Sequence, residues 1–153
     1  MNEPARRRIR RAASPDVPAI VALLAEDPLG AARESPDDLT PYQRAFEAIT
    51  SDPRQLLVVA ERDGAVVGTL QLTFLPGLSR RGATRAQIEG VRVAASARGA
   101  GLGAQLISWA IEESRQRGCQ LVQLTSDASR ADAHRFYQRL GFAPSHVGFK
   151  RAL

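Results

Sequence analysis

Apolar residues recur along the chain with two different spacings, which indicate where helices and strands lie. Segments with apolar residues every three or four positions predict helices at residues 14–26, 42–51, 98–117 and 130–140. Shorter segments between them predict strands at residues 8–12, 56–62, 66–75, 87–93, 121–126 and 142–150. The predicted order is therefore β-α-α-β-β-β-α-β-α-β, with no internal repeat and no linker.

Turn-forming residues mark several boundaries between these elements. Asp63-Gly64 is a strong hairpin signal between two of the predicted strands. Ser14, which Pro15 follows, is typical of a helix start with the serine as cap. Gly90 lies inside a predicted strand and indicates a bulge, which would splay two neighbouring strands.

Length and composition are those of one globular domain. The chain has 153 residues, of which 44% are hydrophobic and 24% are charged, as in a single α/β (α+β) domain with its own core. We place this domain at residues 6–153, after a tail at residues 1–5 that we expect to be disordered. No apolar run approaches the roughly 18 residues of a membrane span. The single cysteine, Cys119, rules out an internal disulfide and is typical of a reducing compartment. We therefore expect a cytoplasmic protein without a membrane partner.

The charge distribution is basic, with a net charge of +5. Arginines crowd the N-terminus, at positions 6, 7, 8, 10 and 11. A basic segment can bind nucleic acid, but no helix-turn-helix, zinc-ligand set or aromatic-studded basic strand accompanies this one. We interpret it as a solvated segment that leads into the first strand, which argues against nucleic-acid binding. His134 and His146 lack a ligand spacing, so no metal site is expected.

A glycine-rich segment, Arg-Gly-Ala-Gly-Leu-Gly-Ala at residues 98–104, follows a predicted strand and opens a helix. Unpaired backbone N–H groups and the partial positive charge of a helix N-terminus suit a phosphate or pyrophosphate. The segment also fits the dinucleotide pattern G-x-G-x-x-G/A, so a nicotinamide enzyme is an alternative. Too little chain follows for a second mononucleotide-binding half, and the preceding strand contains a carboxylate, Glu89. A Walker A site is excluded because no Gly-Lys-Ser/Thr follows.

Two motifs, in the expected order and spacing, resemble the GNAT superfamily of acetyl-CoA-dependent N-acetyltransferases. The first, Gln/Arg-x-x-Gly-x-Gly/Ala, is matched by Arg98, Gly101 and Gly103. The second, Ala-x-x-Phe-Tyr-x-x-Leu-Gly-Phe, is matched by Ala133, Phe136, Tyr137, Leu140, Gly141 and Phe142. The resemblance covers residues 8–150, and the C-terminal half is similar to aminoalkylphosphonate acetyltransferases. It implies a mixed, mostly antiparallel sheet flanked by helices. It also implies direct transfer, in a ternary complex, from acetyl-CoA to a primary amine of a small molecule or peptide.

The resemblance also implies which residues bind the cofactor. The pyrophosphate of coenzyme A would accept hydrogen bonds from backbone N–H groups of Gly99, Ala100, Gly101, Leu102, Gly103 and Ala104. The pantetheine arm would pair with the backbone of Val91 and Val93. Arg98 would add positive charge, unless it is simply solvated. Arg130 stands where many members carry an asparagine that contacts the cofactor, so it is a further candidate.

Two residues are candidates for the proton transfers of the reaction. An amine must lose a proton before it attacks, and Glu89 stands where matching members carry a glutamate base. Its apolar neighbours Ile88, Val91 and Val93 are expected to desolvate it. The alternative is a strand carboxylate paired with Arg92 or Arg85. Tyr137 occupies the family position for the acid that protonates the leaving thiolate. The alternative is a core tyrosine on the apolar face of its helix.

The sequence says less about the acceptor substrate and the assembly than about the cofactor site. Residues 27–40 predict a loop or broken helix whose carboxylates would attract a cationic amine or simply be solvated. If the acceptor carries an anionic group, Arg80, Arg81 or Arg85 would bind it. Dimers are common in the family, so a homodimer is a candidate assembly. The alternative function is an acetyl-CoA-binding sensor or protein-interaction domain without efficient turnover.

Overall fold

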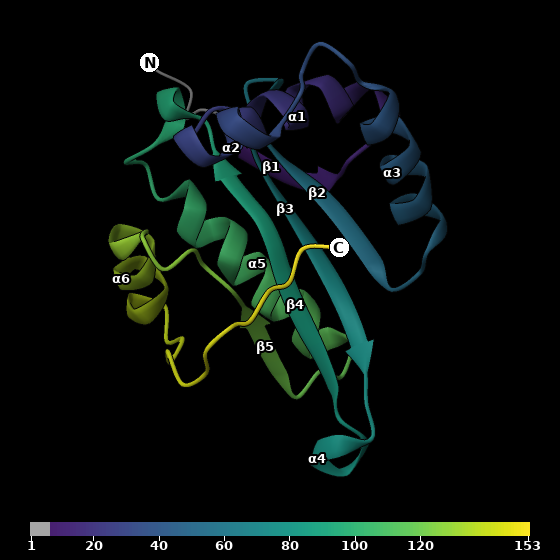
Figure 1. Ribbon diagram of the computed structural model, residues 1–153, viewed down its shortest axis with the longest axis vertical. Coiled ribbons are helices and arrows are strands. Elements are labelled where there is room, and N and C mark those ends of the chain that lie inside the picture. The colour runs from purple at the N-terminus through teal and green to yellow at the C-terminus, as the bar shows by residue number, and fades with distance from the viewer. Residues whose placement is uncertain (1–6) are drawn as a thin grey trace.

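A five-stranded mixed sheet forms the centre of the computed structural model, which describes residues 7–153 (Figure 1). Its strands are β1 (Arg7–Arg11), β2 (Gln55–Arg62), β3 (Ala65–Pro76), β4 (Thr84–Val93) and β5 (Leu121–Leu124), side by side in that order. All neighbours are antiparallel except β4 and β5, which are parallel. The predicted α+β class with a mixed, mostly antiparallel sheet is confirmed. The tail predicted at residues 1–5 lies outside the described residues.

Helices cover both faces of this sheet. They are α1 (Val17–Ala25), α2 (Pro28–Arg33), α3 (Thr40–Ser51), α4 (Ser79–Gly82), α5 (Leu102–Gln116) and α6 (Ala131–Arg139), with short 3-10 turns η1 (Ser14–Asp16) and η2 (Ala95–Ala97). Apolar residues of β2, β3 and β4 that share one face are buried together with Leu106, Ile107 and Ala110 of α5. Because side chains alternate across a strand, Val59 and Thr69 lie on the opposite face, where both are buried.

Two local predictions differ from the structure. Ser14 is not the cap, because Ala13 precedes η1 and its N–H donates to the Asp16 carboxylate at 2.7 Å. The predicted last strand at residues 142–150 was wrong, because β5 is the last strand among residues 7–153. A strand gains stability by burying one face, whereas Val147 and Phe149 remain 78% and 92% exposed. In Figure 1 this C-terminal segment runs in front of β4 without joining the sheet.

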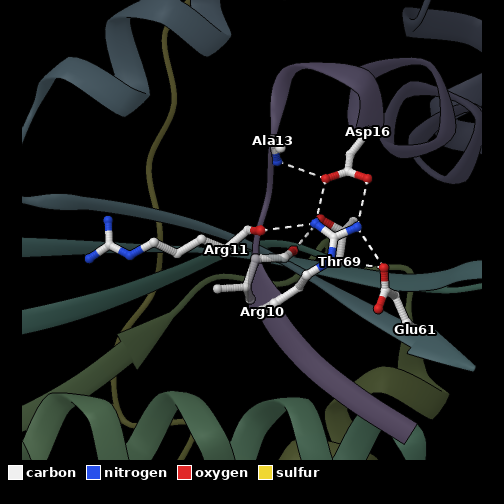
Figure 2. Close-up of polar contacts among 7 residues, drawn as sticks. Arg10, Arg11, Ala13, Asp16, Glu61 and Thr69 are labelled. Atoms are coloured by element: carbon white, nitrogen blue, oxygen red, sulfur yellow. Dashed lines mark hydrogen bonds and ion pairs between the residues drawn. The ribbon is translucent and has the colours of Figure 1, made fainter. Parts of the chain in front are cut away.

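A network of charged side chains holds the residues before α1 against the sheet (Figure 2). Arg10 of β1 donates to both carboxylate oxygens of Asp16, at 2.7 and 2.9 Å, and to Glu61 of β2 at 2.8 Å. The hydrogen bond from Arg10 is the main reason that the pKa of Asp16 lies below its ordinary value. The same carboxylates raise the pKa of Arg10. The bidentate contact joins β1 to the start of α1 in a fixed orientation.

Replacing Asp16 by asparagine is expected to lower the free energy of unfolding at pH 7 by about 2 kcal/mol, because it leaves a half-buried arginine with one acidic partner fewer. A carboxylate whose folded-state pKa is lowered stabilises the fold above its unfolded pKa, near 3.9, and loses that contribution as the pH falls. Denaturant unfolding at pH 7 and pH 3 should therefore show the deficit at pH 7 and a smaller one at pH 3. Asp37→Asn, at an exposed carboxylate, is the matched control, and an equal deficit at both pH values would contradict the account.

Candidate functional site

The sheet opens where β4 leaves β5. These two strands pair only from Arg85 with Leu121 to Ile88 with Leu124, while β4 continues to Val93. Gly90, with a φ of 61°, lies at a register shift between β3 and β4. This is the bulge that the sequence predicted, and it lies just beyond the last residue that pairs with β5. The remaining half of β4 therefore has a free edge.

The carbonyl groups at this free edge belong to the two predicted pantetheine-binding residues. Ala94 donates its N–H to Val67 of β3, so by alternation the backbone groups of Val93 point away from β3. The Val93 carbonyl accepts a hydrogen bond from Arg98 Nε at 3.2 Å. The Val91 carbonyl accepts one from Arg92 Nη1 at 2.9 Å. Both carbonyls are thus directed to the open side, where an extended ligand can pair with them.

The glycine-rich segment forms the turn between β4 and α5. Gly99 and Gly101 have positive φ values of 82° and 76°, which glycine adopts without strain. The helix begins at Leu102, and the first helical N–H with a backbone partner is that of Gln105. The preceding N–H groups, at residues 102–104, are the orphan donors of a helix N-terminus. Leu102 itself is buried in the core, so only its backbone is available to a ligand.

Gly103 is needed for packing between helices. A Cβ at this position would lie 3.3 Å from Cζ of Phe136 in α6. The glycine therefore lets α6 approach the start of α5, which brings the second motif close to the first. At Gly99 and Gly101 a Cβ would meet nothing within 4 Å, so backbone conformation is what requires glycine there.

Part of the basic N-terminal segment contacts this turn. Arg7 of β1 donates to the Ala100 carbonyl at 3.0 Å, and Arg62 of β2 donates to the Ser96 carbonyl at 3.4 Å. Arg7 and Arg62 are directly opposite each other in the sheet. Arg7 stays exposed while it makes this contact, so among residues 7–11 the interpretation of these arginines as a solvated segment was wrong only for Arg10, which is half-buried in its ion pairs.

Glu89 lies on β4 at the point where the strands separate. Its side chain is exposed, so the predicted desolvation was wrong. Its carboxylate Oε1 accepts a hydrogen bond of 2.5 Å from the amide of Gln87. Arg92, one of its suggested partners, instead forms an ion pair with Asp27 at 3.0 Å. The carboxylate is therefore exposed to solvent, with an amide as its neighbour.

Tyr137 lies in α6, half-buried between two aromatic rings. Phe136 and Phe142 meet its ring edge-on, with centroids at 5.2 and 5.9 Å. Burial raises the pKa of its phenol, and the positive charges of Arg130 and Arg92 only partly oppose this. The phenol therefore stays protonated at neutral pH, as a proton donor must.

Asp27, one of the carboxylates at residues 27–40 that the sequence offered for a cationic amine, lies at the junction of α1 and α2 and pairs with Arg92. Burial would raise the pKa of Asp27, but the Gly30 N–H and the charges of Arg92, Arg130 and Arg33 outweigh it, so the pKa is lowered. Asp27 and Arg92 pair without the alignment of a hydrogen bond, which leaves the buried Arg92 Nε without a hydrogen-bond partner. Arg130 also lines a hollow of about 350 Å³ at the start of α6.

Other candidates lie apart from this site or have no reactive character. Arg80 and Arg81 lie in α4, at the far end of the β3–β4 hairpin from the start of α5 (Figure 1). Burial raises the pKa of the Cys119 thiol, which disfavours the reactive thiolate.

No helix among residues 7–153 is long and apolar enough to cross a membrane. Within the same residues, no group of three His, Cys, Asp or Glu side chains is placed to hold a metal ion.

Comparison with known proteins agrees with this arrangement. The model of the acetyltransferase (GNAT) family matches residues 17–142. The chain is 34% identical over 145 residues to aminoalkylphosphonate N-acetyltransferase of Salmonella typhimurium, which covers 95% of this chain and 90% of that protein. It is 30% identical over 139 residues to L-methionine sulfoximine/L-methionine sulfone acetyltransferase of Pseudomonas paraeruginosa, covering 88% and 78% of the two chains.

A solved structure matches the fold over nearly its whole length. The crystal structure of a transcriptional regulator from Bacillus halodurans has a TM-score of 0.94 and 46% identity, and the match covers 97% of this chain and all of that one. The family match, the two acetyltransferase relatives and the arrangement of β4, α5 and α6 lead to one conclusion. The chain belongs to the GNAT family of acetyltransferases.

Proposed function

We propose that the protein transfers the acetyl group of acetyl-CoA, the donor of the GNAT family, to the primary amine of a small molecule, with all reactants bound together. The observation that supports this best is the position of the glycine turn. Orphan N–H groups at the start of α5 follow the free edge of β4 after η2 and the glycine turn. The N–H groups at the start of α5 suit a pyrophosphate, and the free edge of β4 suits a peptide-like arm.

The residues available for coenzyme A fit its two polar parts. Backbone N–H groups of residues 99–104 would hold the pyrophosphate, with Arg98 as a nearby positive charge. The backbone of Val91 and Val93 would pair with the pantetheine amides. For the latter, the side chains of Arg92 and Arg98 would have to release the two carbonyls. Arg130 would contact the cofactor or the acceptor from the start of α6. Bound acetyl-CoA supplies a thioester, whose carbonyl carbon is open to attack by an amine.

Glu89 and Tyr137 would each move one proton of the reaction. Glu89 would take a proton from the acceptor ammonium, directly or through water, and so free its lone pair. The new N–C bond forms as the C–S bond breaks, and the nitrogen then loses its second proton to water. Tyr137 would give its phenolic proton to the departing sulfur and regain one from water. Burial raises the pKa of Tyr137, so the phenol carries this proton at neutral pH. No covalent intermediate on the protein is needed.

The acceptor that we propose is a small primary amine that also carries an acidic group. The two acetyltransferase relatives are named for aminoalkylphosphonates and for amino-acid derivatives, whose amines lie near a phosphonate or a carboxylate. Arg92 lies at the free edge of β4, and the pKa of Asp27 responds to Arg92, Arg130 and Arg33 together. An anionic group would find excess positive charge there.

A matched panel of amines tests this function. Release of the coenzyme A thiol would be followed with aminoalkylphosphonates, amino acids, and amines of equal chain length without the acidic group. We expect turnover with at least one acidic amine, and a kcat/KM at least tenfold lower for its uncharged counterpart. Equal turnover of both would overturn the acceptor class. Absence of acetyl-CoA binding would overturn the function itself.

Replacing Tyr137 by phenylalanine is expected to lower kcat roughly tenfold to a hundredfold, because the leaving thiolate loses its acid. The KM for acetyl-CoA should change little, since the ring keeps its contacts with Phe136 and Phe142. Steady-state kinetics of the variant measure this, with Tyr42→Phe as the control on α3. An unchanged kcat would show that Tyr137 is a core residue only.

A second candidate function is an acetyl-CoA sensor. The observation that favours it is the 46% identity to a protein described as a transcriptional regulator. Tight binding of acetyl-CoA without turnover across the panel would support the sensor over the enzyme.

The single thiol of Cys119 fits a reducing compartment, so we propose a cytoplasmic location. A homodimer also remains a prediction.

A further inference from the structure

A row of polar side chains crosses the sheet on the face opposite α5. Ala86 and Ile88 of β4 are buried in the core that includes α5, so Gln87 and Glu89 lie on the other face. Gln87 is the partner of Thr73 in β3 and of Gln123 in β5. Three neighbouring strands thus place polar side chains beside each other, directly before the point where β4 leaves β5.

Hydrogen bonds connect part of this row to Glu89. The Gln123 amide nitrogen donates to Gln87 Oε1 at 3.0 Å. The Gln87 amide nitrogen in turn donates to Glu89 Oε1 at 2.5 Å. Thr73, although it is in register with Gln87, donates to Gln55 instead, at 2.8 Å. The series of hydrogen bonds that ends at Glu89 therefore contains two other residues, Gln123 and Gln87.

Glu89, the last residue of this series, fixes the direction of its hydrogen bonds. An ionised carboxylate only accepts hydrogen bonds, so Gln87 must turn its nitrogen toward Glu89 and its oxygen toward Gln123. Gln123 must then donate, as it does. Successive hydrogen bonds of one direction polarise each other, and each amide holds the next in a single orientation.

We infer that Gln87, held by Gln123, is a positioning residue that orients Glu89 for proton removal from the acceptor amine. This inference rests on the proposed function of Glu89. The bond from Gln87 occupies Oε1 and leaves Oε2 for the acceptor. Glu89 is exposed, so packing does not fix its rotamer, and the amide supplies the order that packing does not.

The test is a double-mutant cycle on kcat. Gln87→Leu keeps a side chain of similar size without the amide, and we expect it to lower kcat roughly tenfold because the base loses its orientation. The KM for acetyl-CoA should stay unchanged, since the glycine turn is not affected. Gln123→Leu should give a smaller loss, and little further loss when added to Gln87→Leu. Thr73→Val, on the same face and in the same register row, should retain the kcat of the original protein.

The cycle with Glu89 separates positioning from a structural role. In a Glu89→Gln background, Gln87→Leu should cause no further loss, because there is no longer a base to orient. Equal losses in both backgrounds, or full activity of Gln87→Leu, would overturn the inference. If Glu89→Gln itself retains full kcat, the proposed base is wrong and the inference falls with it. Thermal unfolding of each variant identifies any that is inactive because it does not fold.

Discussion

Replacing Glu89 by glutamine is expected to lower kcat for acetyl transfer about a hundredfold, because a positioned general base contributes at least that much to proton removal. The glutamine has nearly the same shape and retains hydrogen bonding, so the sheet and the glycine turn should not change. The dissociation constant for acetyl-CoA should therefore match that of the original protein. Steady-state kinetics together with calorimetric titration of acetyl-CoA measure both quantities.

The matched control for this variant is Glu112→Gln. Glu112 is an exposed carboxylate on α5 that pairs with Arg115, so its loss should leave kcat within twofold. A further check is the pH at which Glu89→Gln is assayed. If the base acts on the ammonium form, high pH should restore part of the rate, because more of the acceptor is already neutral. A variant with the kcat of the original protein at neutral pH would contradict the assignment.

Replacing Gly30 by alanine is expected to lower the free energy of unfolding by about 3 kcal/mol, as overpacking against backbone does at its upper range. A Cβ at Gly30 would lie 1.7 Å from the Leu24 carbonyl oxygen in α1, so α1 and α2 must move apart. Gly30 also donates its N–H to Asp27 at 2.6 Å. The separation would therefore disturb Asp27 and its ion pair with Arg92, and we expect the KM for the acceptor to rise as well.

Gly77→Ala provides the control for that substitution. The nearest atom to a Cβ at Gly77 is the Ala83 carbonyl oxygen at 3.7 Å, an ordinary contact. Its cost should stay within about 0.5 kcal/mol. Equal unfolding free energies for the two alanine variants, measured in denaturant, would show that α2 adapts freely to a larger residue.

β2 and β3 were predicted from apolar residues that the structure buries. Leu56, Val58 and Leu70 are examples, and Asp63-Gly64 joins the two strands as expected. In the segment at residues 142–150, Phe142 packs against the core, but Val147 and Phe149 stay exposed and no residue pairs with the sheet. Its strand prediction therefore rested on the expected order of elements, and it failed.

The places of the two motifs in the fold were predicted because the residues of each motif follow one another in the chain. Spacing alone indicated that the glycine turn opens α5 and that the second motif lies on α6. The exposure of Glu89 was not predicted, because Ile88, its immediate neighbour, points to the opposite face of the strand and cannot desolvate it.

Contacts between distant segments account for what the sequence could not reveal. The pairing of Gln87 with Gln123 requires the parallel register of β4 with β5. The ion pair of Arg92 with Asp27, and the contact of Arg7 with Ala100, likewise join residues far apart in the chain. No local spacing signals any of these, since each depends on how the sheet and helices pack.

The most direct test of the central claim follows the acetyl group itself. Acetyl-CoA labelled in the acetyl carbon would be incubated with the protein and the best acidic amine of the panel, and the products identified by mass spectrometry. We predict one N-acetylated amine for each coenzyme A thiol released, with no label on the protein when the acceptor is omitted. Bound acetyl-CoA without any acetylated amine, or label retained on the protein, would contradict direct transfer to an amine.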